Sequence, residues 1–443
     1  MTKFIRHYLE SECCSSLMFL SVVLYVFFKD SVQLIGDIFQ TIMVVGGLLA
    51  IYLYKGFFLR NIVFLLLVIG ILVQTASWFM STITIPELAQ NHPNIKPFSY
   101  LLVFLVIAFW LKGSVKRSLL VMLSFSLGSI FTLFYHSDFI AQVISGWHGI
   151  RVDFGYRNAQ HGSLIIGAAF IFIFCCTYAA KSEKSRNRYY LMITTTSILL
   201  IFLGCLLLML QSRQSWVAVM VSLLISPLLY AYLSDDISFR KTIVVYISIF
   251  MVFFAMYHVS FVMGRVSTGF SHPDDLHNMI SGNWREVKDL SIGIRLQTWL
   301  EAINWFFANP WLGTGDGSRS LVITESHVLP DYIKAEFRHL HNSNFETAVS
   351  YGVVGLIYVY FLMIYPVYKT IKSNAPALMK TISISFLVYW LIINNFESFL
   401  YMRSGQWVFN TFFGAIYTFS LYSDFVEYQN KKIGLVTYED LYC

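Results

Sequence analysis

Long apolar runs are the feature of this sequence that most constrains its fold. A helix needs about 20 predominantly apolar residues to cross a bilayer core of about 30 Å, and such runs recur along most of the 443 residues. We place their starts near Ser16, Val32, Asn61, Pro97, Ser118, Gly162, Tyr190, Trp216, Thr242, Thr347, Thr381 and Trp407. Only 13% of the residues are charged, about half the share of a soluble domain. The sequence therefore predicts an all-α polytopic membrane protein with about twelve transmembrane helices.

The runs divide the chain into three parts. Helices one to nine are expected in residues 1–261, a long polar loop in 262–345, and helices ten to twelve with a tail in 346–443. The first run lacks a small-residue cleavage site, so we interpret it as a retained helix. We find no internal repeat, and none of the six cysteines lies in the long loop. A disulfide framework or a zinc site of paired cysteines is therefore not expected.

Lysine and arginine predict the orientation, because short translocated loops are depleted in positive charge. One set of connections is rich in both residue types, for example around Lys116 and Lys184. The opposite short loops hold only Lys29, Lys96, Arg151, Arg157, Arg213 and Arg403. We therefore expect both termini in the cytoplasm and the 262–345 loop outside it. This asymmetry explains the net charge of +6 without a nucleic-acid partner.

Arginine dominates the predicted outer face, whereas lysine dominates the cytoplasmic one. The outer arginines are Arg151, Arg157, Arg213, Arg265, Arg285, Arg295, Arg319, Arg338 and Arg403. Arginine binds phosphate bidentately and keeps its charge when partly buried. Solvated charge balanced by acidic loop residues is the alternative for each of them. That alternative is weaker for Arg213, which lies in the tight turn Gln211–Trp216 between two apolar spans, close to lipid head groups.

The long loop shows three patterns. Residues 264–283 are polar and turn-rich, and although His272 and its acidic neighbours are metal-binding types, they suit a solvated turn, so no metal is predicted. From Ile294 the apolar residues recur at helical spacing, which predicts an amphipathic helix opened by Arg295 and ended by Asn309-Pro310. The glycine-rich turn 313–317 is only weak evidence for a phosphate cradle.

The segment from Arg338 to Glu346 is the most informative. Ser343 and Glu346 match the S-x-x-E capping box, so we expect a helix from Ser343, with His341 just outside its N-terminus. The helix dipole and nearby arginines disfavour an imidazolium there, and a neutral imidazole at the membrane surface can act as a general base. The alternative is that His339 and His341 are interfacial residues that help to cap the helix.

Together these motifs resemble the O-antigen ligase family, part of a larger group of ligases and polymerases that use lipid-linked glycans. The resemblance covers about residues 200–370. It is carried by Ser212-Arg213-x-x-Trp216, Arg295 with Trp299, the 309–315 segment, His339-x-His341-Asn342-x-x-Phe345-Glu346, and 351–356. Phe345 stands where leucine is usual, and Gln214 follows the arginine where a small residue is common.

The resemblance implies a GT-C-type glycosyltransferase in the bacterial inner membrane, with its active site on the periplasmic face. The donor would be a glycan on undecaprenyl pyrophosphate, and the acceptor a sugar hydroxyl of lipid A-core. His341 would be the general base, while Arg213 and Arg295 would hold the pyrophosphate. The reaction would invert the anomeric carbon without a metal or other cofactor. Second-tier candidates are His339, Arg157, Arg265, Arg338 and His161.

Three other functions compete with ligation. An O-antigen polymerase uses the same donor, and Arg151 with Gly162 fits its R-x10-G pattern once, but the outer segment 136–161 is short for such an enzyme. A protein O-oligosaccharyltransferase is the second rival. A transporter or flippase, the third, usually has internal repeats and several ionisable groups deep in its spans, whereas Asp37 is the clearest such group here.

Overall fold

The computed structural model describes residues 11–180, 185–234, 239–267, 274, 277–278, 281–283, 286 and 290–433. Every regular element in this part of the chain is a helix. The first nine are α2 (Glu12–Phe28), α3 (Gln33–Leu53), α4 (Lys55–Phe58), α5 (Ile62–Thr84), α6 (Lys96–Leu101), α7 (Val103–Leu111), α8 (Val115–His136), α9 (Phe139–Trp147) and α10 (Ala159–Ala180). Then come α11 (Arg186–Met209), α12 (Arg213–Leu233), α13 (Phe239–Tyr257), α14 (Ser260–Ser267), α16 (Leu290–Ala308), α17 (Ser318–Thr324) and α18 (Asp331–Glu336). The last are α19 (Ser343–Lys372), α20 (Ala377–Ile393), the 3-10 helix η3 (Phe399–Tyr401) and α21 (Arg403–Ile433).

The predicted fold class is confirmed. Seven of the described helices, α3, α5, α8, α10, α11, α12 and α19, are long and apolar enough to cross a membrane. Shorter apolar helices cover Glu12–Phe28, Lys96–Leu111 and Ala377–Ile393. Helices α13 and α21 lie where the ninth and twelfth apolar runs were expected. The largest offsets between a predicted and an observed start are four residues, as between Trp407 and Arg403.

Helix α21 forms the centre of the bundle. Every residue from 405 to 421 is buried, including the large side chains of Trp407 and Tyr417. Its aromatic rings stack on neighbouring helices, for example Phe412 on Phe386 of α20 at a centroid distance of 4.3 Å. A helix that is buried all round must lie inside the bundle rather than face lipid. The first turn of α21 is therefore held at a fixed depth near one end of the molecule.

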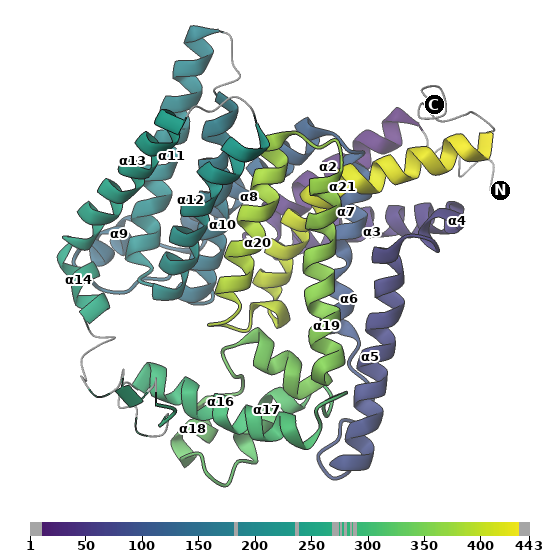
Figure 1. Cartoon of the computed structure of the whole chain (residues 1–443), viewed down its shortest axis with the longest axis vertical. Helices are drawn as coiled ribbons and strands as arrows, with labels where there is room; N and C mark the ends of the chain where they lie inside the picture. The colour runs from purple at the N-terminus through teal and green to yellow at the C-terminus, as the bar shows by residue number, and fades with distance from the viewer. Residues whose placement is uncertain are drawn as a thin grey trace.

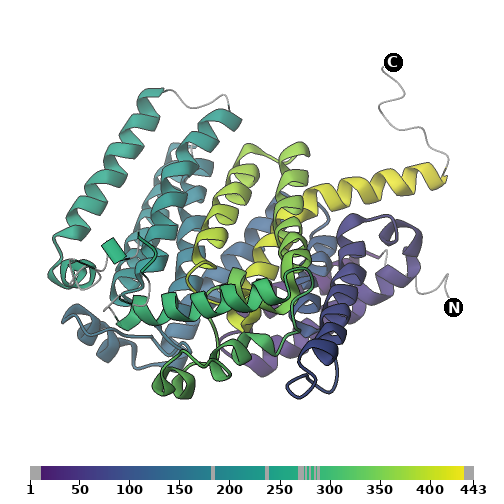
Figure 2. The same ribbon diagram turned by 60° about the horizontal axis from the view of Figure 1, so that its bottom comes forward.

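Helices α16, α17 and α18 lie together across one end of the bundle, as Figures 1 and 2 show. We call α16–α18 with their connections the loop layer, and this end of the molecule the loop side. Apolar residues of α16, α17 and α18, among them Ala302, Ile323 and Ile333, form a small core of their own. Leu340 and Val349 belong to the same core, so the loop layer is packed onto the start of α19.

A kink in α19 anchors the loop layer. Gly352 has φ +63°, and a side chain there would come within 2.3 Å of the Trp311 backbone. The Thr314 and Gly315 N–H groups donate to Val349 and Ser350 carbonyls at 3.1 and 2.9 Å. Because α19 uses these N–H groups, the glycine-rich turn is a docking element and not a phosphate cradle.

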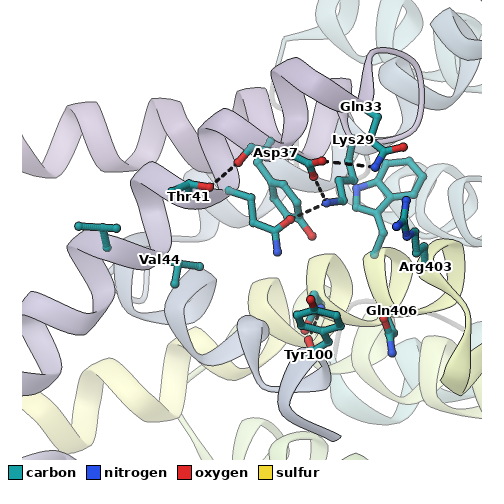
Figure 3. A pocket seen from close by; sticks show the side chains of 13 residues that line it. Lys29, Gln33, Asp37, Thr41, Val44, Tyr100, Arg403 and Gln406 are labelled. Atoms are coloured by element: carbon teal, nitrogen blue, oxygen red, sulfur yellow. Dashed lines mark hydrogen bonds and ion pairs between the residues drawn. The ribbon is translucent and has the colours of Figure 1, made fainter. Parts of the chain in front are cut away.

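A polar cavity of about 420 Å³ lies between α2, α3, α6 and α21, and Figure 3 shows its lining. Asp37 belongs to this lining. It lies in the second turn of α3 and pairs with Lys29 at the end of α2. The carboxylate is therefore close to the loop-side end of its span, rather than deep in it as the sequence suggested.

Candidate active site

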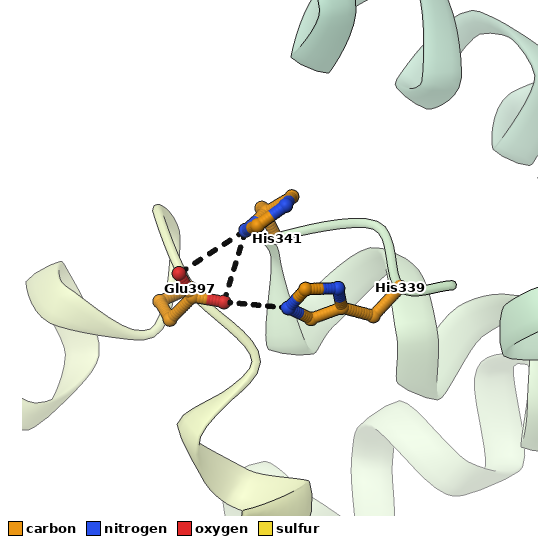
Figure 4. Close-up of side chains that lie close together, drawn as sticks. All are labelled: His339, His341 and Glu397. Carbon is orange, nitrogen blue, oxygen red and sulfur yellow. Dashed lines mark hydrogen bonds and ion pairs between the residues drawn. The ribbon is translucent and has the colours of Figure 1, made fainter. Parts of the chain in front are cut away.

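A buried carboxylate holds both histidines of the His339–His341 segment (Figure 4). The His341 Nδ1 lies 3.1 Å from both carboxylate oxygens of Glu397, and the His339 Nε2 lies 3.3 Å from Oε1. Glu397 is 1% exposed and lies between α20 and η3. Burial by itself raises the pKa of Glu397, but hydrogen bonds from His339 and His341 outweigh it and hold this pKa well below the ordinary range. Glu397 is therefore a carboxylate at neutral pH.

The backbone turns sharply at His341 to present its ring. Its φ of 52° lies in the left-handed region, which costs a residue other than glycine about 1–3 kcal/mol. With Nδ1 directed at Glu397, the Nε2 makes no hydrogen bond to any residue that the structure describes, and the side chain is 15% exposed. A Nδ1–H donated to Glu397 leaves a lone pair on Nε2. This is the tautomer that a general base requires.

Helix α19 begins at Ser343, as predicted, but the predicted capping box is wrong. The N-cap is Asn342, whose Oδ1 accepts from the Asn344 and Phe345 N–H groups at 2.9 and 3.2 Å. An asparagine directly before the serine takes the cap because its amide oxygen reaches the same orphan N–H groups. The Ser343 hydroxyl instead donates to the Asn394 Oδ1 at 2.7 Å and lies 3.1 Å from the Glu397 carbonyl oxygen. The start of α19 is thereby tied to the segment that carries Glu397.

Glu346 joins the two halves of the site instead of capping the helix. Its Oε1 accepts from the Leu340 N–H at 3.0 Å and from the Ser398 hydroxyl. Leu340 precedes His341 and Ser398 follows Glu397, so one buried carboxylate fixes the neighbours of both residues. Arg319 of α17 balances this charge, with its guanidinium 3.5 Å from Glu346 and 2.8 Å from Asp316. Burial alone would lower the pKa of Arg319, but the two carboxylates raise it above its ordinary value.

Arg295 reaches the site through Gln160. When the Gln160 amide is oriented to satisfy its neighbours, its oxygen accepts from the Arg295 Nη2 at 3.1 Å and its nitrogen donates to the Glu397 Oε2. Arg295 does not open its helix, because α16 begins at Leu290. Trp299, one turn after Arg295, donates from its indole to the Leu340 carbonyl at 2.7 Å. The Arg295-x-x-x-Trp299 spacing therefore turns two side chains of one helix face toward the His341 segment.

Arg213 is the first residue of α12, at the same end of the bundle as Gln160. Ser215 donates to Ser163 of α10 at 2.7 Å, and Ser163 lies one turn from Gln160. The guanidinium of Arg213 is half-buried and makes no hydrogen bond or ion pair to the described residues. A positive group that no protein group engages, at the start of a helix, is suited to an anionic ligand. No hydrogen bond or ion pair joins Arg213 to His341.

The second-tier residues have different surroundings. His161 is buried, and its Nδ1 contacts the Ser404 hydroxyl, so it is less accessible than His341. Arg157 is exposed and acts on His161 through its charge. Arg338 donates to the Phe337 and Lys334 carbonyls. The Arg265 side chain and His272 lie outside the described residues.

The histidine–carboxylate group has a second chemical capability. One ligand atom each from His339, His341 and Glu397 lie within 4.8 Å of one another. In a tetrahedral zinc site with bonds of about 2.0–2.1 Å, ligand atoms are about 3.3 Å apart. The separations in this group thus suit hydrogen bonds and metal binding alike, and a chelator can distinguish the two.

Comparison with known proteins agrees with the sequence motifs. The family model described as O-antigen ligase matches residues 198–360, a segment that includes Arg213, Arg295 and His341. Among curated proteins, no significant match to the chain is found. The match agrees with the predicted resemblance: over residues 198–360, this multi-pass membrane protein is similar to the O-antigen ligase family.

Proposed function

We propose that this protein is an O-antigen ligase of the bacterial inner membrane. It transfers a glycan from undecaprenyl pyrophosphate to a sugar hydroxyl of lipid A-core, on the periplasmic face. The observation that carries the proposal is the His341 ring held by buried Glu397, with Nε2 unengaged by the described residues. The family match supports the reaction class, and the excess of arginine on the loop side supports an anionic donor there.

In the proposed reaction His341 Nε2 takes the proton of the acceptor hydroxyl. The acceptor oxygen attacks the anomeric carbon as its bond to the pyrophosphate oxygen breaks, so the configuration inverts and undecaprenyl pyrophosphate leaves as an anion. Glu397 stabilises the imidazolium that forms, as the aspartate of a serine-protease triad does. Arg213 and Arg295 stabilise the charge that develops on the pyrophosphate. The pyrophosphate arrives with the carrier lipid, so no nucleotide is needed.

Reconstitution tests this proposal against the polymerase alternative. The purified protein is placed in liposomes with undecaprenyl-pyrophosphate-linked glycan, with or without lipid A-core, and the products are separated by size. We expect glycan on lipid A-core and free undecaprenyl pyrophosphate, and no reaction without the acceptor. Glycan that lengthens on the carrier lipid in the absence of lipid A-core would instead identify a polymerase.

A separate prediction concerns the two arginines proposed to bind the pyrophosphate. Arg213→Gln and Arg295→Gln are each expected to lower kcat by about 10²–10³-fold, the usual cost of losing a donor that stabilises transition-state charge. Lysine at either position should restore only part of the rate, because it cannot bind two phosphate oxygens in one plane. Initial rates of product formation measure this. Arg188→Gln, an exposed change at the opposite end of the bundle, is the matched control.

We propose a metal-free reaction, in which arginines replace the divalent ion that neutralises pyrophosphate in other transferases. Transfer by the purified protein should therefore be unchanged after prolonged incubation with excess EDTA. The initial rate before and after chelation is the measurement. Loss of activity that returns on addition of Zn²⁺ would show instead that His339, His341 and Glu397 hold an ion.

A further inference from the structure

The cavity between α2, α3, α6 and α21 has the features of a second binding site (Figure 3). Its lining from α2 and α3 is Tyr25, Lys29, Gln33, Asp37, Gln40, Thr41, Val44 and Val45. Tyr100 of α6 and Arg403, Gln406, Trp407 and Asn410 of α21 complete it. None of these residues contributes to the His341 site. The cavity begins at the loop-side ends of α2 and α21, where we expect lipid head groups on that face.

The lining of the cavity changes from charged to apolar along α3. Gln33 and Asp37 lie in its first two turns, Gln40 and Thr41 follow, and Val44 and Val45 close the series. At 1.5 Å per residue, the twelve steps from Gln33 to Val45 cover about 18 Å along α3. A surface that is polar at the loop-side end of α3 and apolar farther along the helix matches an amphiphile whose chain lies along α3.

The charges in the cavity favour an anion. Lys29 pairs with Asp37 and donates to Gln40 at 2.5 Å, so those two charges largely cancel. Arg403 adds a second positive charge, which acts on Asp37 electrostatically. Its guanidinium is exposed and makes no hydrogen bond to any described residue. The three ionic side chains that line the cavity thus leave one surplus positive charge, on an arginine, the residue type that binds phosphate best.

We propose that this cavity binds the phosphate head group of an anionic membrane lipid, with Arg403 on the phosphate and an acyl chain along Val44 and Val45. Such a site is independent of glycan transfer. It adjoins the second-tier residue His161, because Ser404 contacts His161 and the preceding residue, Arg403, lines the cavity.

Native mass spectrometry of the delipidated full-length protein tests the proposal. Phosphatidylglycerol, phosphatidylcholine and inorganic phosphate are added in turn, and the fraction of protein that retains each is measured. We expect about tenfold preference for phosphatidylglycerol over phosphatidylcholine, as for one charge-assisted contact, and no displacement by inorganic phosphate. Equal retention of both lipids would overturn the proposal. Displacement by inorganic phosphate would reveal an ion site in place of a lipid site.

Two variants that should change the retention of phosphatidylglycerol in opposite directions test whether the lipid binds in the cavity. Arg403→Gln should remove the preference for phosphatidylglycerol, whereas Asp37→Asn should increase retention of this lipid, because it frees Lys29. Arg188→Gln, which changes the charge equally at the other end of the bundle, should have no effect. If Arg403→Gln does not fold, the Asp37→Asn result still decides. Lower or unchanged phosphatidylglycerol retention in Asp37→Asn would contradict the proposal.

Discussion

Replacement of His341 by alanine is expected to lower the rate of glycan transfer by about 10²–10⁴-fold, the range that a positioned general base contributes. The reason is the geometry of its ring, because Glu397 engages Nδ1 and leaves Nε2 to accept a proton. KM for the donor should change little, since the imidazole is not proposed to bind pyrophosphate. The measurement is the initial rate in liposomes at matched protein levels.

His327→Ala is the matched control, because His327 is an exposed histidine elsewhere in the loop layer. Transfer at the full rate by His341→Ala would refute the base assignment and direct attention to His161. His339→Ala should have a smaller effect than His341→Ala, because it removes only one of the two histidines that contact Glu397 and leaves His341 in place.

Glu397→Gln is expected to lower kcat by up to about 10⁴-fold, the loss seen for the matching change in a serine-protease triad, again with little change in KM. An amide of the same shape cannot stabilise the imidazolium, and its NH₂ group can hold the ring in the wrong tautomer. If the two residues act as one unit, His341→Ala with Glu397→Gln should be hardly slower than His341→Ala alone. Fully additive losses in this double-mutant cycle would show that Glu397 acts elsewhere.

The pH dependence of the wild-type protein gives a further check on Glu397. Because its folded pKa is depressed, its contribution to stability is present above the unfolded value of about 4.3. That contribution is lost only as the pH falls through the lower folded value. Thermal stability between pH 5 and 8 should therefore show no transition caused by Glu397. Glu397→Gln should lower the thermal stability in this range.

The sequence predicted the helices well because each span must satisfy the same local demand. Lipid requires about 20 apolar residues in every spanning helix, and this pattern can be read without knowledge of neighbouring helices. The start of α19 at Ser343 was predicted for the same local reason. Its cap was assigned to Ser343 instead of Asn342, because both residues are good N-caps and the choice depends on contacts with the segment after α20.

The partners of His341 could not be predicted in the same way. Glu397 is 56 residues away and Gln160 lies in another part of the chain, so their meeting depends on how α10, α19 and α20 pack. The helix dipole and the nearby arginines can be inferred from the sequence, whereas the buried carboxylate that holds the His341 ring cannot. One signal was available, since Glu397 is an ionisable residue within the polar stretch that directly follows an apolar span.

The docking of the loop layer on α19 limits how a large glycan could enter. Backbone hydrogen bonds at Thr314 and Gly315 fasten the layer to α19, and the Gly315 N–H also donates to Ser77 of α5 at 2.9 Å. Asp316 adds a contact with Asn94, after α5, at 2.8 Å. These attachments lie along one side of the layer. The loop layer is therefore fixed on the side of α5 and α19. We expect any movement that widens the access to His341 to pivot about this side, with the opposite side moving outward.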